Sequence, residues 1–166
     1  FVSWQNYHGP DFSKFSPEPF RFAYHGVEYK EESGPLLEIP VTIGFLQNNF
    51  NASHKILTIL EKPLFKRFHL PGILERLRLL NKVWLSPELS GTGDMIKLAK
   101  KMKKNRYSVI NLTFHSTSLK KGSSPFVRTS DEESKFINRI SSFLDYAYHA
   151  GWESHTISEM AGRIKI

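Results

Sequence analysis

The amino-acid sequence predicts an α/β fold: a partial (β/α) barrel with about four parallel strands and intervening helices. Apolar runs rich in β-branched and aromatic residues, which are typical of buried strands, alternate with segments of helical periodicity. The order strand, helix, strand, helix, strand, helix, strand indicates parallel strands joined by helices. Four strands are too few to close a barrel. We therefore expect open sheet edges, covered by a missing amino-terminal half or by self-association.

Length and composition favour one domain over residues 1–166. Residues 1–35 are rich in aromatic side chains and proline, so we expect an ordered, irregular segment there, followed by β/α units over 36–166. No apolar run approaches the roughly 20 residues of a membrane-spanning helix. The chain has no cysteine, which excludes disulfides and cysteine nucleophiles but leaves the compartment open. No basic-then-apolar leader follows Phe1, and this slightly favours a cytoplasmic location.

The formal charge of +7 arises from 23 basic and 16 acidic side chains, and much of the excess lies in residues 97–106. Such a run can bind nucleic acid or an acidic polysaccharide, or it can be the solvated side of one amphipathic helix. Apolar residues recur around it with helical spacing, which favours the helix; they are Met95, Ile96, Leu98, Ala99 and Met102. We therefore do not expect nucleic acid to be the main partner.

Two strands are predicted in the first part of the β/α region. Residues 36–45 give a strong strand signal, but Pro40 indicates an edge or irregular strand because proline cannot donate a ladder hydrogen bond. Residues 83–86 predict a second, short strand. Between them, helical spacing is mixed over residues 53–69 and clearer over 71–81.

The second part begins with a turn at residues 90–94, whose polar side chains can cap the basic helix. Residues 107–115 are an apolar, β-branched run that indicates a buried strand. The clearest helix begins at residues 129–130, where capping residues precede three acidic ones, and Gly151 ends it. Residues 152–157 predict a last short strand, which a terminal helical turn follows.

The end of the 107–115 run is the best candidate for a functional site. The apolar run changes there to His115, followed by three hydroxyl residues. Ligands in α/β folds collect just past the carboxyl ends of strands, and histidine side chains titrate near neutral pH, so His115 is a candidate acid or base. The alternative is a structural histidine bonded to a neighbouring loop. No zinc-ligand spacing and no nucleophile elbow occurs in the sequence.

Five sequence motifs carry a further indication. They are Asn-Leu-Thr-Phe-His-Ser-Thr-Ser-Leu at 111–119, Gly-Ser-Ser-Pro-Phe-Val-Arg-Thr at 122–129, Trp-Glu-Ser-His-Thr-Ile-Ser-Glu at 152–159, Leu-Glu-Ile-Pro-Val-Thr at 37–42 and Val-Trp-Leu-Ser-Pro-Glu at 83–88. In order and spacing they resemble the carboxyl-terminal half of the polysaccharide deacetylase-like, or NodB-homology, proteins. With short matches at 9–12 and 19–21, the resemblance covers nearly the whole chain.

The resemblance implies a distorted (β/α) barrel in which one aspartate and two histidines bind a divalent, zinc-type metal. It also implies hydrolysis of N- or O-acetyl groups on sugars by a metal-activated water, with a second aspartate as base and a late histidine as acid. The acid corresponds to His115; Leu112 would line the acetyl pocket, and Ser116 would contact substrate. The family's Asp-Asp and paired-histidine motifs have no counterpart here, so no metal ligand is identifiable in this chain.

The leading hypothesis from the sequence is therefore a fragment of a metal-dependent carbohydrate deacetylase, inactive alone, whose partner is an acetylated polysaccharide or sugar. One alternative is a non-catalytic carbohydrate-binding or interaction module, in which the aromatic rings of residues 1–35 stack on sugar faces. The other alternative, a nucleic-acid-binding domain, depends on the basic run at 97–106 alone.

Overall fold

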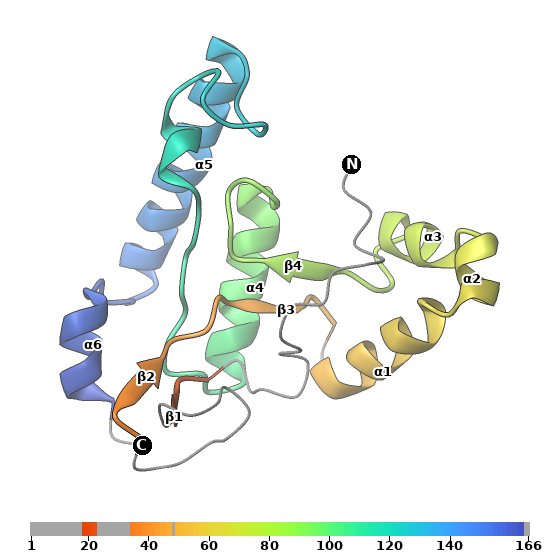
Figure 1. Ribbon diagram of the computed structural model, residues 1–166, viewed down its shortest axis with the longest axis horizontal. Helices are drawn as coiled ribbons and strands as arrows, with labels where there is room; N and C mark the ends of the chain where they lie inside the picture. The colour runs from red at the N-terminus through yellow and green to blue at the C-terminus, as the bar shows by residue number, and fades with distance from the viewer. Residues whose placement is uncertain (1–17, 23–33, 48, 165–166) are drawn as a thin grey trace.

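The computed structural model describes residues 18–22, 34–47 and 49–164 (Figure 1). Its longer helices are α1 (Phe50–Leu60), α4 (Thr92–Lys104) and α5 (Ser130–His149). The shorter ones are α2 (Pro63–Arg67), α3 (Leu70–Arg76), α6 (Ile157–Arg163) and the 3-10 helix η2 (Ser116–Leu119). Most of the predicted aromatic segment at 1–35 lies outside the described residues.

The predicted partial (β/α) barrel of parallel strands is wrong. The described residues form two small sheets, each of two antiparallel strands. Strand β1 (Phe20–Phe22) pairs with β2 (Leu36–Glu38), and β3 (Ile43–Phe45) pairs with β4 (Lys82–Trp84). The predicted 36–45 strand is split around Pro40 into β2 and β3, which belong to different sheets. Helices α1, α2 and α3 therefore connect two antiparallel strands, not the parallel strands of a barrel.

The predicted strand at 107–115 is also absent as a strand. The segment is extended and half-buried up to Thr113, but its hydrogen bonds are scattered. The Thr113 amide donates to the Leu85 carbonyl at 3.1 Å, and the Asn111 amide donates to the Thr42 hydroxyl at 2.7 Å. The Asn111 side chain donates to the Ile39 carbonyl at 3.1 Å. These amides thus have single partners from different parts of the chain, one of them a side chain, in place of a strand ladder.

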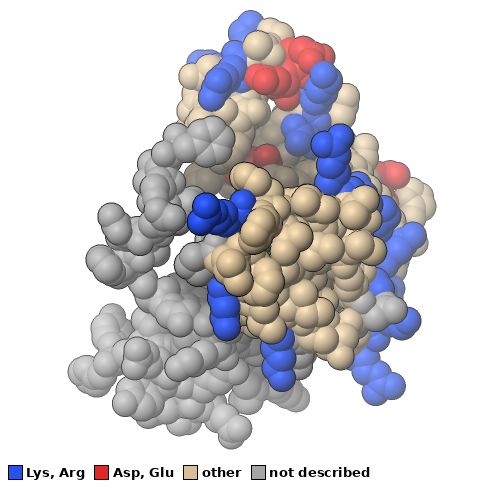
Figure 2. Space-filling model, turned by 90° about the vertical axis from the view of Figure 1, so that its right-hand side faces the viewer, with Lys and Arg blue, Asp and Glu red and all other residues tan. Residues whose placement is uncertain are grey.

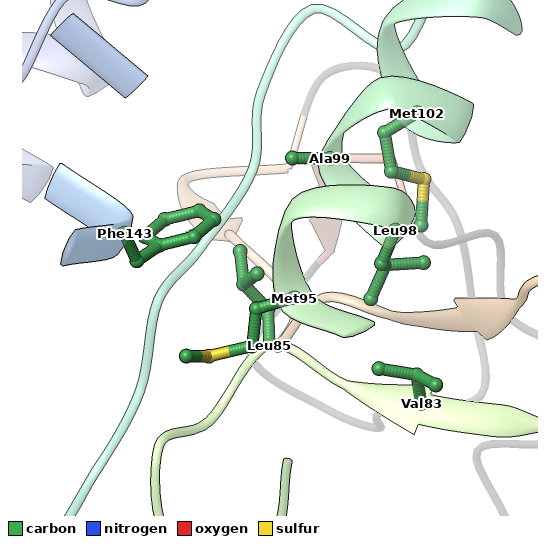
Figure 3. Close-up of a cluster of buried hydrophobic side chains, with 7 residues drawn as sticks. All are labelled: Val83, Leu85, Met95, Leu98, Ala99, Met102 and Phe143. Carbon is green, nitrogen blue, oxygen red and sulfur yellow. The ribbon is translucent and has the colours of Figure 1, made fainter. Parts of the chain in front are cut away.

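Helix α4 holds the hydrophobic core. Its residues Met95, Leu98, Ala99 and Met102 are fully buried, while Lys97, Lys100, Lys103 and Lys104 are exposed, so the predicted amphipathic helix is confirmed. Figure 3 shows the buried cluster that these four residues form with Val83, Leu85 and Phe143. The cluster joins α4 to the β4 end and to α5. The extended segment 107–115 passes between α4 and α5, and Leu112 packs against the cluster.

Helix ends follow the sequence closely in the last third of the chain. Thr129 and Glu132 form a reciprocal capping box at α5, and Gly151, with φ of 74°, follows its last turn. Thr156 and Glu159 repeat the box at α6, where the predicted strand at 152–157 has no ladder partner among the described residues. The predicted side-chain cap of α4 is wrong, because its N-cap is Gly91, which has no side-chain bond. The helix predicted at 71–81 is present as α3 but ends earlier, at Arg76.

No helix in the described parts of the chain combines the length and apolar character that a bilayer crossing requires.

A substitution at Gly44 tests how tightly β3 approaches the core. An added Cβ there would lie 2.8 Å from Leu98 Cδ1 and 3.1 Å from Met102 Cε, and both side chains are buried. We expect Gly44→Ala to lower the free energy of unfolding by about 1–3 kcal/mol, measured by chemical denaturation. The control is Gly93→Ala in α4, where nothing lies within 4 Å; it should be neutral or stabilising by up to about 1 kcal/mol. Equal stability of the two variants would contradict this packing.

Candidate functional site

A buried carboxylate lies just after β4. Ser86 and Pro87 are buried, and the amides of Leu89 and Ser90 donate to the Ser86 carbonyl at 3.2 and 2.9 Å, which forms a tight turn around Glu88. The Glu88 side chain is only 4% exposed. A buried charge is costly unless hydrogen bonds compensate it, so the donors around Glu88 determine whether its carboxyl is ionised.

His115 binds this carboxylate twice. The His115 amide donates to Glu88 Oε1 at 3.1 Å, and His115 Nδ1 lies 2.8 Å from Glu88 Oε2. The imidazole itself remains 73% exposed. One buried side chain therefore fixes both the backbone and the ring orientation of an exposed histidine.

Two serines complete the network. The Ser118 hydroxyl, fully buried in η2, donates to Glu88 Oε1. Ser118 Oγ also lies 2.9 Å from Ser124 Oγ; because its single proton goes to Glu88, the Ser124 hydroxyl is the donor in that pair. The Phe126 amide in turn donates to Ser124 Oγ at 3.3 Å.

The ring of Phe126 packs against the His115 ring. It lies almost parallel to the His115 ring, with an interplanar angle of 14° and 6.1 Å between the centroids. Phe126 is 39% exposed, so the stacked pair presents aromatic surface to solvent. The loop after η2 thus supports Glu88 through Ser124 and contacts His115 through Phe126.

The environment of Glu88 lowers its pKa. Burial by itself raises the pKa of the carboxyl, but hydrogen bonds from the Ser118 hydroxyl, the His115 ring and the His115 amide, together with the attraction of His115, lower it further than burial raises it. Glu88 is therefore ionised at neutral pH. A carboxylate only accepts hydrogen bonds, so His115 Nδ1 carries the proton that it donates. Nε2 is then the ring nitrogen that can take up or release a proton.

The three predicted site residues have different positions. His115 joins the network directly. Ser116 is exposed and opens η2, next to the histidine but outside the network. Leu112 is half-buried and packs against the hydrophobic core. Leu112 therefore contributes to packing between α4 and α5.

Sequence reasoning missed Glu88, Ser118, Ser124 and Phe126 as site residues. Glu88 closes the motif at 83–88, and the other three lie in the motifs at 111–119 and 122–129. Of these four residues only Glu88 has a signal in the sequence, as the acidic residue directly after Leu-Ser-Pro. Its burial and its pairing with a residue 27 positions later are visible only in the fold.

The residues that the structure describes contain no group of three His, Cys, Asp or Glu side chains that could hold a metal ion. The other paired histidines contact nearby groups in their own segments. His149 Nδ1 lies 2.8 Å from the Asp145 carbonyl oxygen, and His155 Nε2 lies 3.1 Å from Glu153 Oε2. The described residues therefore do not fit the metal centre that the family resemblance implies.

Comparisons of this chain with protein-family models, with curated proteins and with solved structures found no match. The resemblance to the deacetylase-like family thus depends on the sequence motifs alone.

The Glu88 network predicts a titration effect. We expect carbon-detected NMR of the side-chain carboxyls to give Glu88 a pKa below the ordinary value of about 4.3, and Ser118→Ala to raise it because one compensating bond is lost. The ionised carboxylate stabilises the fold above that ordinary pKa, and this contribution is lost as the pH falls through the lowered one. Thr117→Ala, at the exposed neighbouring position, is the control and should leave the titration unchanged. A normal Glu88 pKa in the unsubstituted chain would contradict the network.

Proposed function

We propose that this chain is part of a metal-dependent carbohydrate deacetylase and contributes its catalytic acid, His115. The observation that carries the proposal is the 2.8 Å contact between His115 Nδ1 and the buried Glu88 carboxylate. It supports an acid role because a carboxylate that accepts a hydrogen bond from Nδ1 fixes the tautomer and the orientation of the imidazole. The motifs that resemble those of the deacetylase-like proteins suggest the reaction class.

In the proposed reaction, water gives one proton to the base that the resemblance implies and attacks the carbonyl carbon of an acetyl group on a sugar. The bond from that carbon to the sugar nitrogen or oxygen then breaks, and the protonated His115 gives its Nε2 proton to the departing atom. Acetate and a free amine or hydroxyl are the products. Glu88 keeps Nδ1 protonated throughout and offsets the positive charge of the imidazolium. The chain contributes only this acid function.

The proposal assigns the metal ligands and the base to sequence upstream of this chain. The described residues lack a metal-binding group, and the family's aspartate and histidine motifs have no counterpart in the sequence. For this reason we expect the chain alone to be inactive.

An aromatic ring beside the acid supports a sugar substrate. Phe126 stacks on His115 and remains partly exposed, and exposed aromatic rings offer an apolar face to the C–H bonds of a sugar ring. The same observation favours the second candidate function, a non-catalytic carbohydrate-binding module. Metal-independent retention of the isolated chain on acetylated glycan, together with no acetate release by the longer protein, would favour that second function.

The acid role predicts a large rate effect. In a longer protein that includes the upstream sequence and is loaded with metal, we expect His115→Ala to lower the rate of acetate release from acetylated chito-oligosaccharide by about 10²–10⁴-fold. Loss of a proton donor affects the chemical step, so the effect should fall on kcat more than on KM. Acetate released over time is the measurement.

His149→Ala is the matched control, because His149 is an exposed histidine at the end of α5, outside the network. It should retain the full rate. Full acetate release by His115→Ala would remove the acid role, and the absence of Asp-Asp and paired-histidine motifs upstream would remove the deacetylase assignment.

A further inference from the structure

Helices α1, α2 and α3 form a lobe that exposes large apolar side chains. Leu64, Phe68, Leu77 and Leu79 are each exposed by at least 60%, and Ile59 and Ile73 by almost half. Single exposed leucines are ordinary on a protein surface, but a cluster from one lobe is not. In Figure 1 the lobe lies on the opposite side of α4 from α5.

The same lobe is strongly basic. Residues 55–80 contain six Lys or Arg and only two acidic residues, Glu61 and Glu75. Lys55, Lys62, Arg67 and Arg76 are exposed, and among the described residues none of these four forms an ion pair. Figure 2, which faces the lobe, shows neutral surface in the centre with Lys and Arg around it.

We propose that the α1–α3 lobe is a peripheral docking surface for an anionic lipid bilayer. Exposed apolar side chains from short helices can enter the boundary between headgroups and acyl chains, while the surrounding Lys and Arg side chains remain at the level of anionic headgroups. The long apolar stems of these cations can lie against the apolar side chains as their charges reach the headgroups. This proposal is independent of the proposed acid role of His115.

Two other occupants fit the lobe less well. Nucleic acid would pair with the cations but would leave most of the apolar side chains without a partner. A second copy of the chain, docked through the same lobe, would bring two sets of basic side chains together, and like charges repel. An anionic bilayer matches both the exposed apolar side chains of the lobe and the Lys and Arg side chains around its neutral surface.

Co-sedimentation of the chain with vesicles tests the proposal. We expect binding to vesicles of phosphatidylcholine with about one-third phosphatidylglycerol, and much weaker binding to phosphatidylcholine alone. Arg67→Gln/Arg76→Gln should weaken partitioning at least about 20-fold, because each cation near an anionic surface contributes roughly fivefold. Leu64→Ser/Leu77→Ser should weaken it at least about tenfold through lost apolar burial.

The controls carry the same changes elsewhere. Lys100→Gln/Lys104→Gln removes two exposed cations from α4, and Leu144→Ser/Tyr148→Ser removes exposed apolar groups from α5. Both should bind vesicles like the unsubstituted chain. All substituted positions are exposed, and far-ultraviolet circular dichroism checks that each variant folds. As a second measurement, Phe68→Trp should gain fluorescence that brominated lipid quenches.

Several results would overturn the proposal. The first is equal binding to neutral and anionic vesicles at low salt, and the second is an equal loss of binding in the control variants. The third is that the chain does not bind vesicles but forms a concentration-dependent dimer, which Leu77→Ser dissociates. A longer protein with the upstream sequence that no longer binds vesicles would also overturn it, because another part of the protein would then cover the lobe. Vesicle binding tests the docking surface, and acetate release tests the deacetylase proposal. Because the two measurements are separate, the failure of one proposal is distinguishable from the failure of the other.

Discussion

The buried carboxylate of Glu88 constrains the part of the fold around His115. Removing a carboxylate from water costs several kcal/mol, and hydrogen bonds have to offset that cost. Three donors do so: the Ser118 hydroxyl, the His115 amide and the His115 ring. Their positions tie the end of β4 to the segment that leads into η2. An imidazole that is mostly exposed thereby acquires a fixed orientation.

Helix α4 makes this arrangement possible. Its buried residues pack against Leu85, directly before the Ser86–Glu88 turn, and against Phe143 of α5. The extended segment 107–115 lies between α4 and α5 and is bonded to Leu85 through Thr113. The core therefore sets the spacing between Glu88 and His115, while the loop from Ser124 to Phe126 adds support from outside. Local packing and the polar network reinforce each other.

The sequence predicted α4 and α5 correctly because their signals are local. In α4 the signal is the apolar spacing from Met95 to Met102, and in α5 it is the Thr129–Glu132 capping box. Each involves residues only a few positions apart. The strands were predicted less well, because pairing partners lie far apart in the chain. Residues 107–115 have strand composition, yet Asn111 takes its partners from Thr42 and Ile39, about 70 positions away. Strand-like composition therefore does not show that a segment joins a parallel sheet, because its hydrogen bonds can go to scattered residues such as these.

Only the His115 part of the candidate site was predicted from the sequence, because its partner Glu88 also lies far away in the chain. The change from apolar residues to His115 and hydroxyls marked one half in the sequence. Glu88 lies 27 positions earlier, and an acidic residue after a proline is ordinary in a sequence. Leu112, which the resemblance assigns to the acetyl pocket, packs against the hydrophobic core. Burial, which gives Glu88 its role, is a property of the folded chain.

The most direct test of this account is the tautomer of the His115 ring, read by nitrogen-15 NMR at a pH where the ring is neutral. If Glu88 holds the ring as described, Nδ1 carries the proton, and Glu88→Ala shifts the ring toward the tautomer with the proton on Nε2. A ring protonated on Nε2 in the unsubstituted chain, with no response to Glu88→Ala, would contradict the account.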